Sequence, residues 1–117
     1  MELNQPVALV TDSSISLPHA LVKNNPIFVA PIQLILNEIT YQDGVDIWPN
    51  EFYRLLRTSS SVPTTAGVSP LSFQRLFTEI SKTASTILCI TIAKEFSSTY
   101  HAAILAMEQT KDTIKET

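Results

Sequence analysis

Short apolar runs alternate with amphipathic segments along most of the chain. Val7–Val10, Ile27–Ala30 and Ile87–Ile92 are continuous runs of mainly aliphatic residues, which is typical of strands buried on both faces of a parallel sheet. Between the last two runs, apolar residues recur with the 3.6-residue period of an amphipathic helix, at Phe73, Leu76, Phe77 and Ile80. The pattern therefore predicts strands and helices in alternation, which favours helices packed on a parallel sheet.

Further helices are predicted from their first turns. Ser16 with Pro18, and Ser69 with Pro70, combine a capping hydroxyl with a proline at a helix start, where the missing N–H costs little. Pro49 opens another helix, with an apolar stripe at Phe52, Leu55 and Leu56. A last helix is expected from about Thr99, with one face formed by Tyr100, Ala103, Ile104 and Met107, and with a polar tail from Glu108 to Thr117 that frays.

The segment after the second run predicts a β-hairpin. Pro31 interrupts the run, so the strand should bend or lie near a sheet edge there, and Asn37-Glu38 is a two-residue turn into an antiparallel return at Ile39–Tyr41. Asp43-Gly44 marks the next turn. Taken together, the elements predict one α/β domain over residues 1–117, a three-layer-like parallel sheet with flanking helices and a β-hairpin excursion.

A polar, hydroxyl-rich run at Thr58–Pro70 is predicted to be a loop between two helices. The carboxyl ends of parallel strands lie at one edge of a sheet, and ligands bind there. We therefore expect Thr11–Ser14, the loop around Thr64-Thr65 and Ala93–Thr99 to meet. Serine and threonine hydroxyls beside the free N–H groups of helix starts favour a small anionic group.

Composition excludes several classes of protein. Apolar residues make up 44% and charged residues 16% of the chain, which argues against disorder. The net charge is -3 and no basic block is present, so no nucleic-acid partner is expected. No apolar run approaches the roughly 20 residues of a membrane span, and the N-terminus does not resemble a secretion signal. These features predict a cytoplasmic protein.

Metal and thiol chemistry are not expected. Cys89 is the single cysteine, which excludes an internal disulfide, and it lies in an apolar run, where a buried, inert thiol is typical. His19 and His101 lack the spacing of metal ligands. Asp43 and Asp46 are interpreted as turn residues, because a calcium loop would need more acids. No metal and no cofactor are therefore predicted.

Five segments resemble the DegV family in order and in spacing. They span about Val7 to Met107 and are Val10-Thr11-Asp12-Ser13-Ser14, Tyr41-Gln42-Asp43-Gly44-Val45-Asp46, Pro49-x-Glu51-Phe52-Tyr53, Val62-Pro63-Thr64-Thr65 and Phe96-Ser97-Ser98-Thr99-Tyr100. The resemblance implies a bacterial fatty-acid-binding protein that presents its acyl ligand to a fatty acid kinase. Family members have two α/β lobes around the lipid, and this chain resembles the N-terminal lobe only, with the second lobe absent.

The resemblance also implies a ligand site. Thr64 would donate a hydrogen bond to the lipid carboxylate with Thr65 beside it, Asp12 and Ser13 would shape the first loop, and Ser97 the third. The chain departs from the family pattern in three places, because Ala66-Gly67-Val68 precede Ser69, Ala93-Lys94-Glu95 replace a serine-rich segment, and Ser98 replaces a glycine. Where the family has a serine that contacts the carboxylate, Lys94 would either replace that contact with charge or point to solvent.

Three alternatives to this assignment follow from the residues themselves. Thr64 and Thr65 could bond only to the backbone of their own loop. The chain could be a structural or regulatory lobe that binds another protein, or a small-anion-processing enzyme using Asp12 and Lys94. A missing second lobe would also leave apolar surface uncovered and favour a homo-oligomer, with Ile35, Leu36, Val68 and Phe96 as the expected exposed residues.

Overall fold

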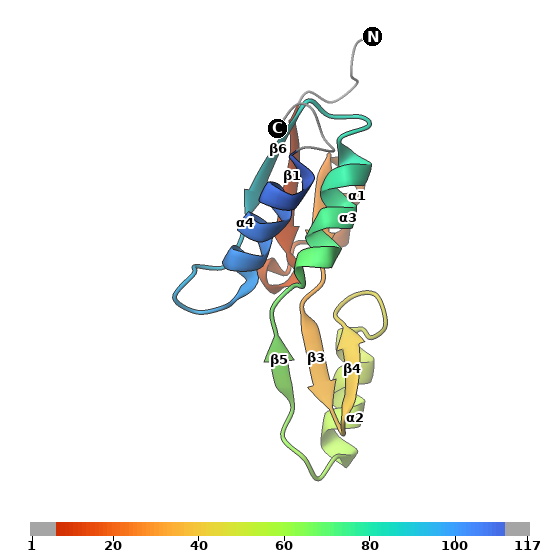
Figure 1. Ribbon diagram of the computed structural model, residues 1–117. Coiled ribbons are helices and arrows are strands. Elements are labelled where there is room, and N and C mark those ends of the chain that lie inside the picture. Colours follow the sequence, from red (N-terminus) through yellow and green to blue (C-terminus); the bar gives the residue numbers. More distant parts are fainter. Residues whose placement is uncertain (1–6, 112–117) are drawn as a thin grey trace.

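Two three-stranded sheets follow one another along the molecule in the computed structural model (Figure 1), which describes residues 7–111. The molecule is elongated, with principal extents of 54 × 29 × 22 Å. One sheet is parallel and carries most of the helices. The other is antiparallel and projects below it (Figure 1).

The parallel sheet consists of the three apolar runs that the sequence predicts to be strands. They are β1 (Val7–Asp12), β2 (Ile27–Ala30) and β6 (Thr86–Ile90), in the spatial order β2-β1-β6. In the register of the sheet, Val10 of the central strand lies between Phe28 and Cys89. The α/β fold with a parallel sheet and flanking helices is therefore confirmed.

Helices lie on the parallel sheet in a doubly wound arrangement. A 3-10 turn, η1 (Ser13–Ile15), follows β1, and α1 (His19–Asn24) contacts β2. The helices α3 (Pro70–Ile80) and α4 (Thr99–Thr110) lie side by side on the face drawn in front in Figure 1. Right-handed crossovers in opposite directions from β1 and β2 place α1 and α3 on opposite faces of the sheet.

The core lies between the parallel sheet and the pair α3 and α4. Phe73 and Phe77 of α3 are stacked with ring centroids 5.6 Å apart, and with Ile80 they form the predicted buried stripe. The α4 side of this core is made of alanines, which allow the two helices to approach closely, namely Ala102, Ala103 and Ala106. The predicted face of α4 is thus only partly a core face, because Tyr100 and Met107 are 39% and 47% exposed.

The second sheet contains the predicted hairpin. It is formed by β3 (Gln33–Leu36), β4 (Ile39–Gln42) and β5 (Thr64–Ala66) in the order β4-β3-β5. Asn37 and Glu38 have φ values of 52° and 65°, as a two-residue hairpin turn requires. The chain leaves one sheet and enters the other at Pro31, as predicted, and α2 (Pro49–Thr58) follows the hairpin.

Two predictions about local structure are wrong. The run Thr58–Pro70 is not loop throughout, because β3 offers a free edge to which Thr64–Ala66 pairs as β5. Ser16 does not cap α1, because it takes a left-handed conformation at the end of η1, and Pro18 precedes the helix without a side-chain cap. Ser69 does cap α3, since its hydroxyl accepts a hydrogen bond from the Ser72 N–H at 3.1 Å.

The exposure predictions are mixed. Phe96 is 79% exposed, as expected, and Ile35 is half-buried. Leu36 and Val68 are each only 2% exposed, which contradicts the prediction, and Val68 belongs to the core of the parallel sheet. The predicted fraying tail is helical at Glu108–Thr110, and its residues 112–117 lie outside the described residues.

Candidate ligand-binding site

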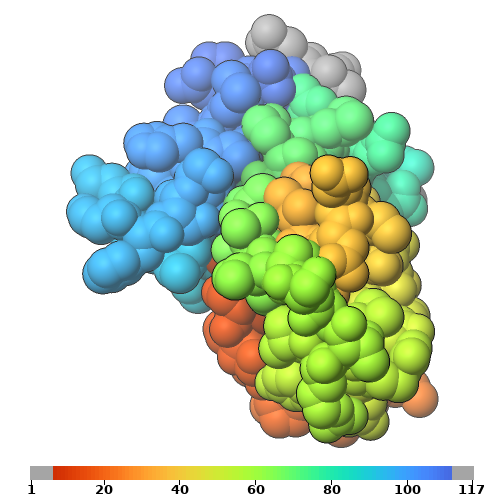
Figure 2. All heavy atoms as spheres, turned by 90° about the horizontal axis from the view of Figure 1, so that it is seen from below, coloured from red at the N-terminus to blue at the C-terminus, as the bar shows by residue number. Residues whose placement is uncertain are grey.

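A cavity of about 280 Å³ lies where the two sheets meet. Four separate segments of the chain line it: the turn after β1, the link between β2 and β3, the end of β5, and the loop between β6 and α4. In a view from below, the light-blue residues that precede α4 stand at one side of the molecule (Figure 2). The lining residues are Ser14, Ile32, Thr65, Ala66, Gly67, Ile92, Phe96, Ser97 and Ser98.

Asp12 connects two of these segments. Its side chain is 1% exposed. One carboxylate oxygen, Oδ1, accepts hydrogen bonds from the N–H of Ser14 at 2.9 Å and from the Ser14 hydroxyl, while Oδ2 accepts one from the N–H of Ile92 at 3.0 Å. Both oxygens are therefore engaged within the protein. Asp12 fixes the loops after β1 and β6 relative to each other, and a direct contact of Asp12 with a ligand stays a prediction.

Ser13 connects the same turn to the start of the second sheet. Its hydroxyl accepts a hydrogen bond from the N–H of Ile32 at 3.0 Å, directly after the Pro31 bend. Proline cannot donate a hydrogen bond, so the next N–H is the first that can anchor the chain here. Ser13 thus shapes the wall of the cavity, and Ser14 rather than Ser13 lines it.

Gly67 allows β5 to approach the start of α4. A Cβ atom at this position would lie 2.6 Å from Thr99 Oγ1 and 2.8 Å from Ser98 Oγ, which is closer than real contacts allow. The N–H of Val68 donates to Thr99 Oγ1 at 3.2 Å, and Thr99 N–H donates to Ser97 Oγ at 3.2 Å. Gly67 and these hydrogen bonds hold the loop before α4 beside β5.

Thr64 and Thr65 are exposed on β5 and pair through their backbone with Ile35 and Leu34 of β3. Within residues 7–111, neither threonine hydroxyl has a hydrogen-bond partner, so the alternative that they bond to their own loop is wrong. Neighbouring residues of a strand point to opposite faces. Accordingly, Thr65 lines the cavity and Thr64 does not.

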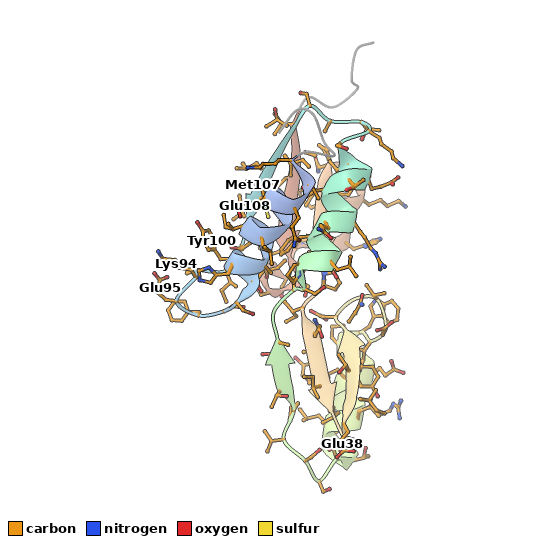
Figure 3. The ribbon with its side chains drawn as sticks, viewed as in Figure 1. Glu38, Lys94, Glu95, Tyr100, Met107 and Glu108 are labelled. Atoms are coloured by element: carbon orange, nitrogen blue, oxygen red, sulfur yellow. The ribbon has the colours of Figure 1, made fainter. Side chains whose placement is uncertain are left out.

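The structure brings Ser97 to the cavity but not Lys94. Ser97 lines the cavity, and its hydroxyl lies 2.9 Å from Thr99 Oγ1. Lys94 is exposed and lies with Glu95 at the outer side of the loop (Figure 3). Asp12 is enclosed and Lys94 faces outward, so the pair required by the enzyme alternative does not converge on this cavity.

Sequence reasoning missed most of the cavity lining. Phe96, Ser98 and the backbone of Ala66-Gly67 line the cavity beside the expected hydroxyls. The loop Ala93–Thr99 was expected at this edge of the sheet, but within it Phe96 was expected only as exposed apolar surface. A helpful signal was Gly67 itself, because an isolated glycine at a strand end often marks a close approach of another segment.

A second, apolar groove of about 240 Å³ lies between β6 and α4. It is lined by residues of the predicted α4 face, Tyr100, Ala103, Ile104 and Met107, and by Ile87 and Cys89 of β6. Burial, and then the nearby charge of Asp12, raise the pKa of the Cys89 thiol from 9.0 to about 11. The thiol is therefore neutral near pH 7 and is a poor nucleophile.

Across residues 7–111, no three side chains of His, Cys, Asp or Glu gather as a metal site. No helix in that range has the length and apolar character needed to cross a membrane.

Comparison with known proteins identifies relatives along almost the whole chain. The family model described as "Uncharacterised protein, DegV family" matches residues 6–115. A DegV domain-containing protein of Caldanaerobacter subterraneus is 38% identical over 102 residues, which cover 87% of this chain and 36% of that protein. A DegV domain-containing protein of Clostridium acetobutylicum is 29% identical over 102 residues, covering 87% of this chain and 37% of the relative.

Solved structures share the fold. A DegV family protein of Thermus thermophilus, described by its fatty acid binding, matches with a TM-score of 0.79 and 31% identity, covering 90% of this chain and 38% of that one. A stearic acid-binding protein of Eubacterium ventriosum matches with a TM-score of 0.83 and 26% identity, covering 92% and 37%. The chain thus spans a little over a third of the length of these relatives.

Proposed function

The chain belongs to the DegV family, and we propose that it forms one lobe of a fatty-acid-binding protein and holds the carboxylate of the acyl ligand. The observation that carries the proposal is the cavity in which Thr65, Ser97 and the start of α4 meet. The relatives from Thermus thermophilus and Eubacterium ventriosum, which are described as binding fatty acids, support the class of ligand.

The cavity has the chemistry that a carboxylate head group needs. An ionised carboxylate only accepts hydrogen bonds, and the unengaged Thr65 hydroxyl at the cavity can donate one. N–H groups in the first turn of a helix lack partners within the helix and favour an anion, and α4 begins at Thr99 beside the cavity. We therefore assign the carboxylate to the space between Thr65 and the start of α4.

Apolar side chains at the same cavity suit the first methylene groups of an acyl chain. Ile32 and Ile92 line it, and Phe96 lines it while 79% exposed. Covering Phe96 with an acyl chain would remove apolar surface from water, which is favourable at about 25 cal/mol per Å². The ligand would thus lie with its head group at the hydroxyls and its chain along Phe96.

Thr65 and not Thr64 is the primary donor in this proposal. The two are neighbours on β5, both are exposed, and only Thr65 lines the cavity. The other expected site residues have different roles: Asp12 and Ser13 position the loops, Ser97 holds the start of α4, and Lys94 stays at the periphery. The small-anion enzyme is disfavoured, because the Asp12 carboxylate is already engaged by Ser14 and Ile92.

The proposal extends to the complete protein. The relatives are longer than this chain, and a second lobe would complete the site around the acyl chain. The complete protein would work in the cytoplasm as a binding protein without chemistry of its own and would present the acyl carboxylate to a fatty acid kinase. Apolar surface left uncovered by a missing lobe would favour self-association of this chain.

Titration calorimetry with oleate tests the site directly, with native mass spectrometry of the purified chain to detect bound acyl chains. We expect measurable binding by this chain, and about tenfold weaker binding for Thr65→Ala, because a hydrogen bond to a charged group is worth about 1.5–3 kcal/mol. Thr65→Ser keeps the hydroxyl and should retain affinity.

Thr64→Ala is the matched control, since it removes the same group from the next residue of the same strand. Its affinity should stay within about twofold of the unchanged chain. Equal losses for both alanine variants would refute the assignment of Thr65. A chain that binds no oleate at all would show that this lobe does not hold the carboxylate by itself.

A further inference from the structure

Strand β5 carries little information of its own about its register on β3. It has only three residues, Thr64–Ala66, and none of their side chains is buried. The register of a strand is firmly specified where one of its faces is buried, and weakly specified where neither is. A shift by one residue would place Thr64 where Thr65 now lies, with an identical side chain. The register of β5 must therefore be set by what holds its two ends.

One end of β5 is held at the junction of the two sheets. The N–H of Val68 donates to Thr99 Oγ1 at 3.2 Å, and Nε2 of Gln33 donates to the carbonyl oxygen of Gly67 at 3.4 Å. A glycine beside a strand end readily takes up an extra residue as a bulge. This end alone therefore leaves the register open.

The other end of β5 is held by the side chain of Asn37, at the tip of the hairpin. Asn37 Oδ1 accepts hydrogen bonds from the hydroxyls of Ser59, at 2.9 Å, and Ser61, at 2.6 Å. The two hydroxyls lie 3.2 Å apart, and the N–H of Ser61 donates to Ser59 Oγ at 3.1 Å. These bonds join the turn between β3 and β4 to the segment that enters β5 at Thr64.

Asparagine suits both the backbone and the contacts at this position. The φ of Asn37 is 52°, a left-handed conformation that asparagine adopts more readily than most residues. Its amide oxygen has two lone pairs, one for each serine hydroxyl. Glu38 has a φ of 65°, but its side chain makes no hydrogen bond or ion pair within residues 7–111. Of the two turn residues, only Asn37 holds the segment before β5.

We propose that Asn37 is a positioning residue of the ligand-binding site, which sets the register of β5 and so keeps Thr65, and not Thr64, at the cavity. Its two hydrogen bonds fix the start of the strand relative to the hairpin tip, while Val68 fixes the chain after the strand. The consequence for affinity rests on the proposed role of Thr65 as the carboxylate donor. The register itself is measurable without a ligand.

Asn37→Gly tests the proposal, because glycine adopts the left-handed φ without strain and lacks the acceptor oxygen. In NMR spectra of the free chain, the cross-strand contacts between Leu34 and Thr65 should weaken, and contacts between Leu34 and Thr64 should appear. The β5 amides should exchange with solvent about tenfold faster, because the strand opens more often. Asn37→Asp keeps an acceptor oxygen and should retain the contacts of the unchanged chain.

Two further variants separate the hydrogen bonds from other effects of the substitution. Ser59→Ala combined with Ser61→Ala removes the donors in place of the acceptor and should reproduce the changes seen in Asn37→Gly. Glu38→Gly makes the matched change at the other turn residue, which is labelled at the hairpin tip in Figure 3. It should leave the register unchanged. A shifted register in Glu38→Gly, or an unshifted one in the double serine variant, would overturn the proposal.

Oleate titration connects the register to the site. In the unchanged chain, Thr65→Ala should weaken binding about tenfold and Thr64→Ala by no more than about twofold. In the Asn37→Gly background the two losses should converge to about threefold each, because either threonine then reaches the cavity. A loss of stability alone would weaken binding in both alanine variants and preserve the difference between them.

The outcomes distinguish this role of Asn37 from the proposed function. Unchanged cross-strand contacts in Asn37→Gly would overturn the role of Asn37. So would an undiminished difference between Thr65→Ala and Thr64→Ala in that background. A shifted register in Asn37→Gly, together with no oleate binding by any variant, would refute the proposed function and support the role of Asn37 in setting the register.

Discussion

The parallel body (β1, β2, β6, α1, α3 and α4) and the antiparallel extension (β3, β4, β5 and α2) differ in how much core supports them. The connected core of buried side chains belongs to the body, including three residues of α3. The extension contributes only Leu36 and Ile47 to the buried hydrophobic residues described, and α2 contributes none. The extension therefore depends on its backbone pairing and its turns.

The two regions also contribute differently to the cavity: the body fixes the loops around it, and the extension presents Thr65. The body holds Asp12 and Thr99 almost completely buried, and these residues fix the loops around the cavity. The extension presents Thr65 with a free hydroxyl on a three-residue strand. Ligand-binding groups commonly lie on such exposed segments that a rigid scaffold positions. The cavity lies where the two regions meet, because residues of both regions line it.

The largest expected effect comes from truncating matched phenylalanines in the two regions. Phe73→Ala in the body should lower the free energy of unfolding by about 3–5 kcal/mol, because Phe73 is fully buried and stacked on Phe77. Phe52→Ala in α2 should cost about 1–2 kcal/mol, because Phe52 is half-buried against Tyr53. Urea denaturation of both variants measures the difference. Equal losses would show that the extension has a core as important as that of the body.

The two glycines sharpen the comparison at the junction. Gly67→Ala should cost about 1–3 kcal/mol, because the new methyl group overlaps Thr99 and Ser98, and it should weaken oleate binding by moving β5 away from α4. Gly44→Ala meets nothing within 4 Å and costs only the strain of its φ of 78°, about 1 kcal/mol.

Thermal denaturation and oleate titration of the two glycine variants provide the measurement. Gly44→Ala should leave the affinity for oleate unchanged, since Gly44 does not line the cavity. If both variants lose stability but neither loses affinity, the close approach at Gly67 supports the fold and not the site.

The body was predictable from sequence because its signals are long and local. The runs beginning at Val7, Ile27 and Ile87 became strands, the last shifted to Thr86–Ile90, and the stripe through Phe73 became the buried face of α3. The hairpin turn at Asn37-Glu38 was predictable for the same reason. In each case a few adjacent residues carry enough information to select the local structure.

The remaining features depend on contacts between distant segments. Thr64–Ala66 became a strand because β3 offers it an edge, and three residues carry no period of their own. Val68 is buried because α4 packs beside it, and Thr65 was distinguished from Thr64 only by the face of β5 on which it lies. The sequence placed the hydroxyls at the correct end of the sheet, while the cavity required the three-dimensional arrangement.

The smallest expected effect concerns the apolar groove between β6 and α4, which Cys89 lines. Its pKa rises from 9.0 in the unfolded chain to about 11 in the folded protein, mainly through burial and secondly through the charge of Asp12. Between pH 9 and 11 the unfolded chain therefore binds fewer protons than the folded protein. The stabilising contribution of the neutral thiol is complete below pH 9 and is lost as the pH rises through 11.

Melting temperatures measured from pH 8 to 11 for the unchanged chain and for Cys89→Ala test this shift. The unchanged chain should lose stability more steeply above pH 9, because the alanine variant has no thiol to ionise. Alkylation by iodoacetamide at pH 8.5 should likewise be much slower in the folded protein than in urea, since the thiolate is the reactive form. Equal alkylation rates in the folded protein and in urea would mean that the groove does not shield the Cys89 thiol.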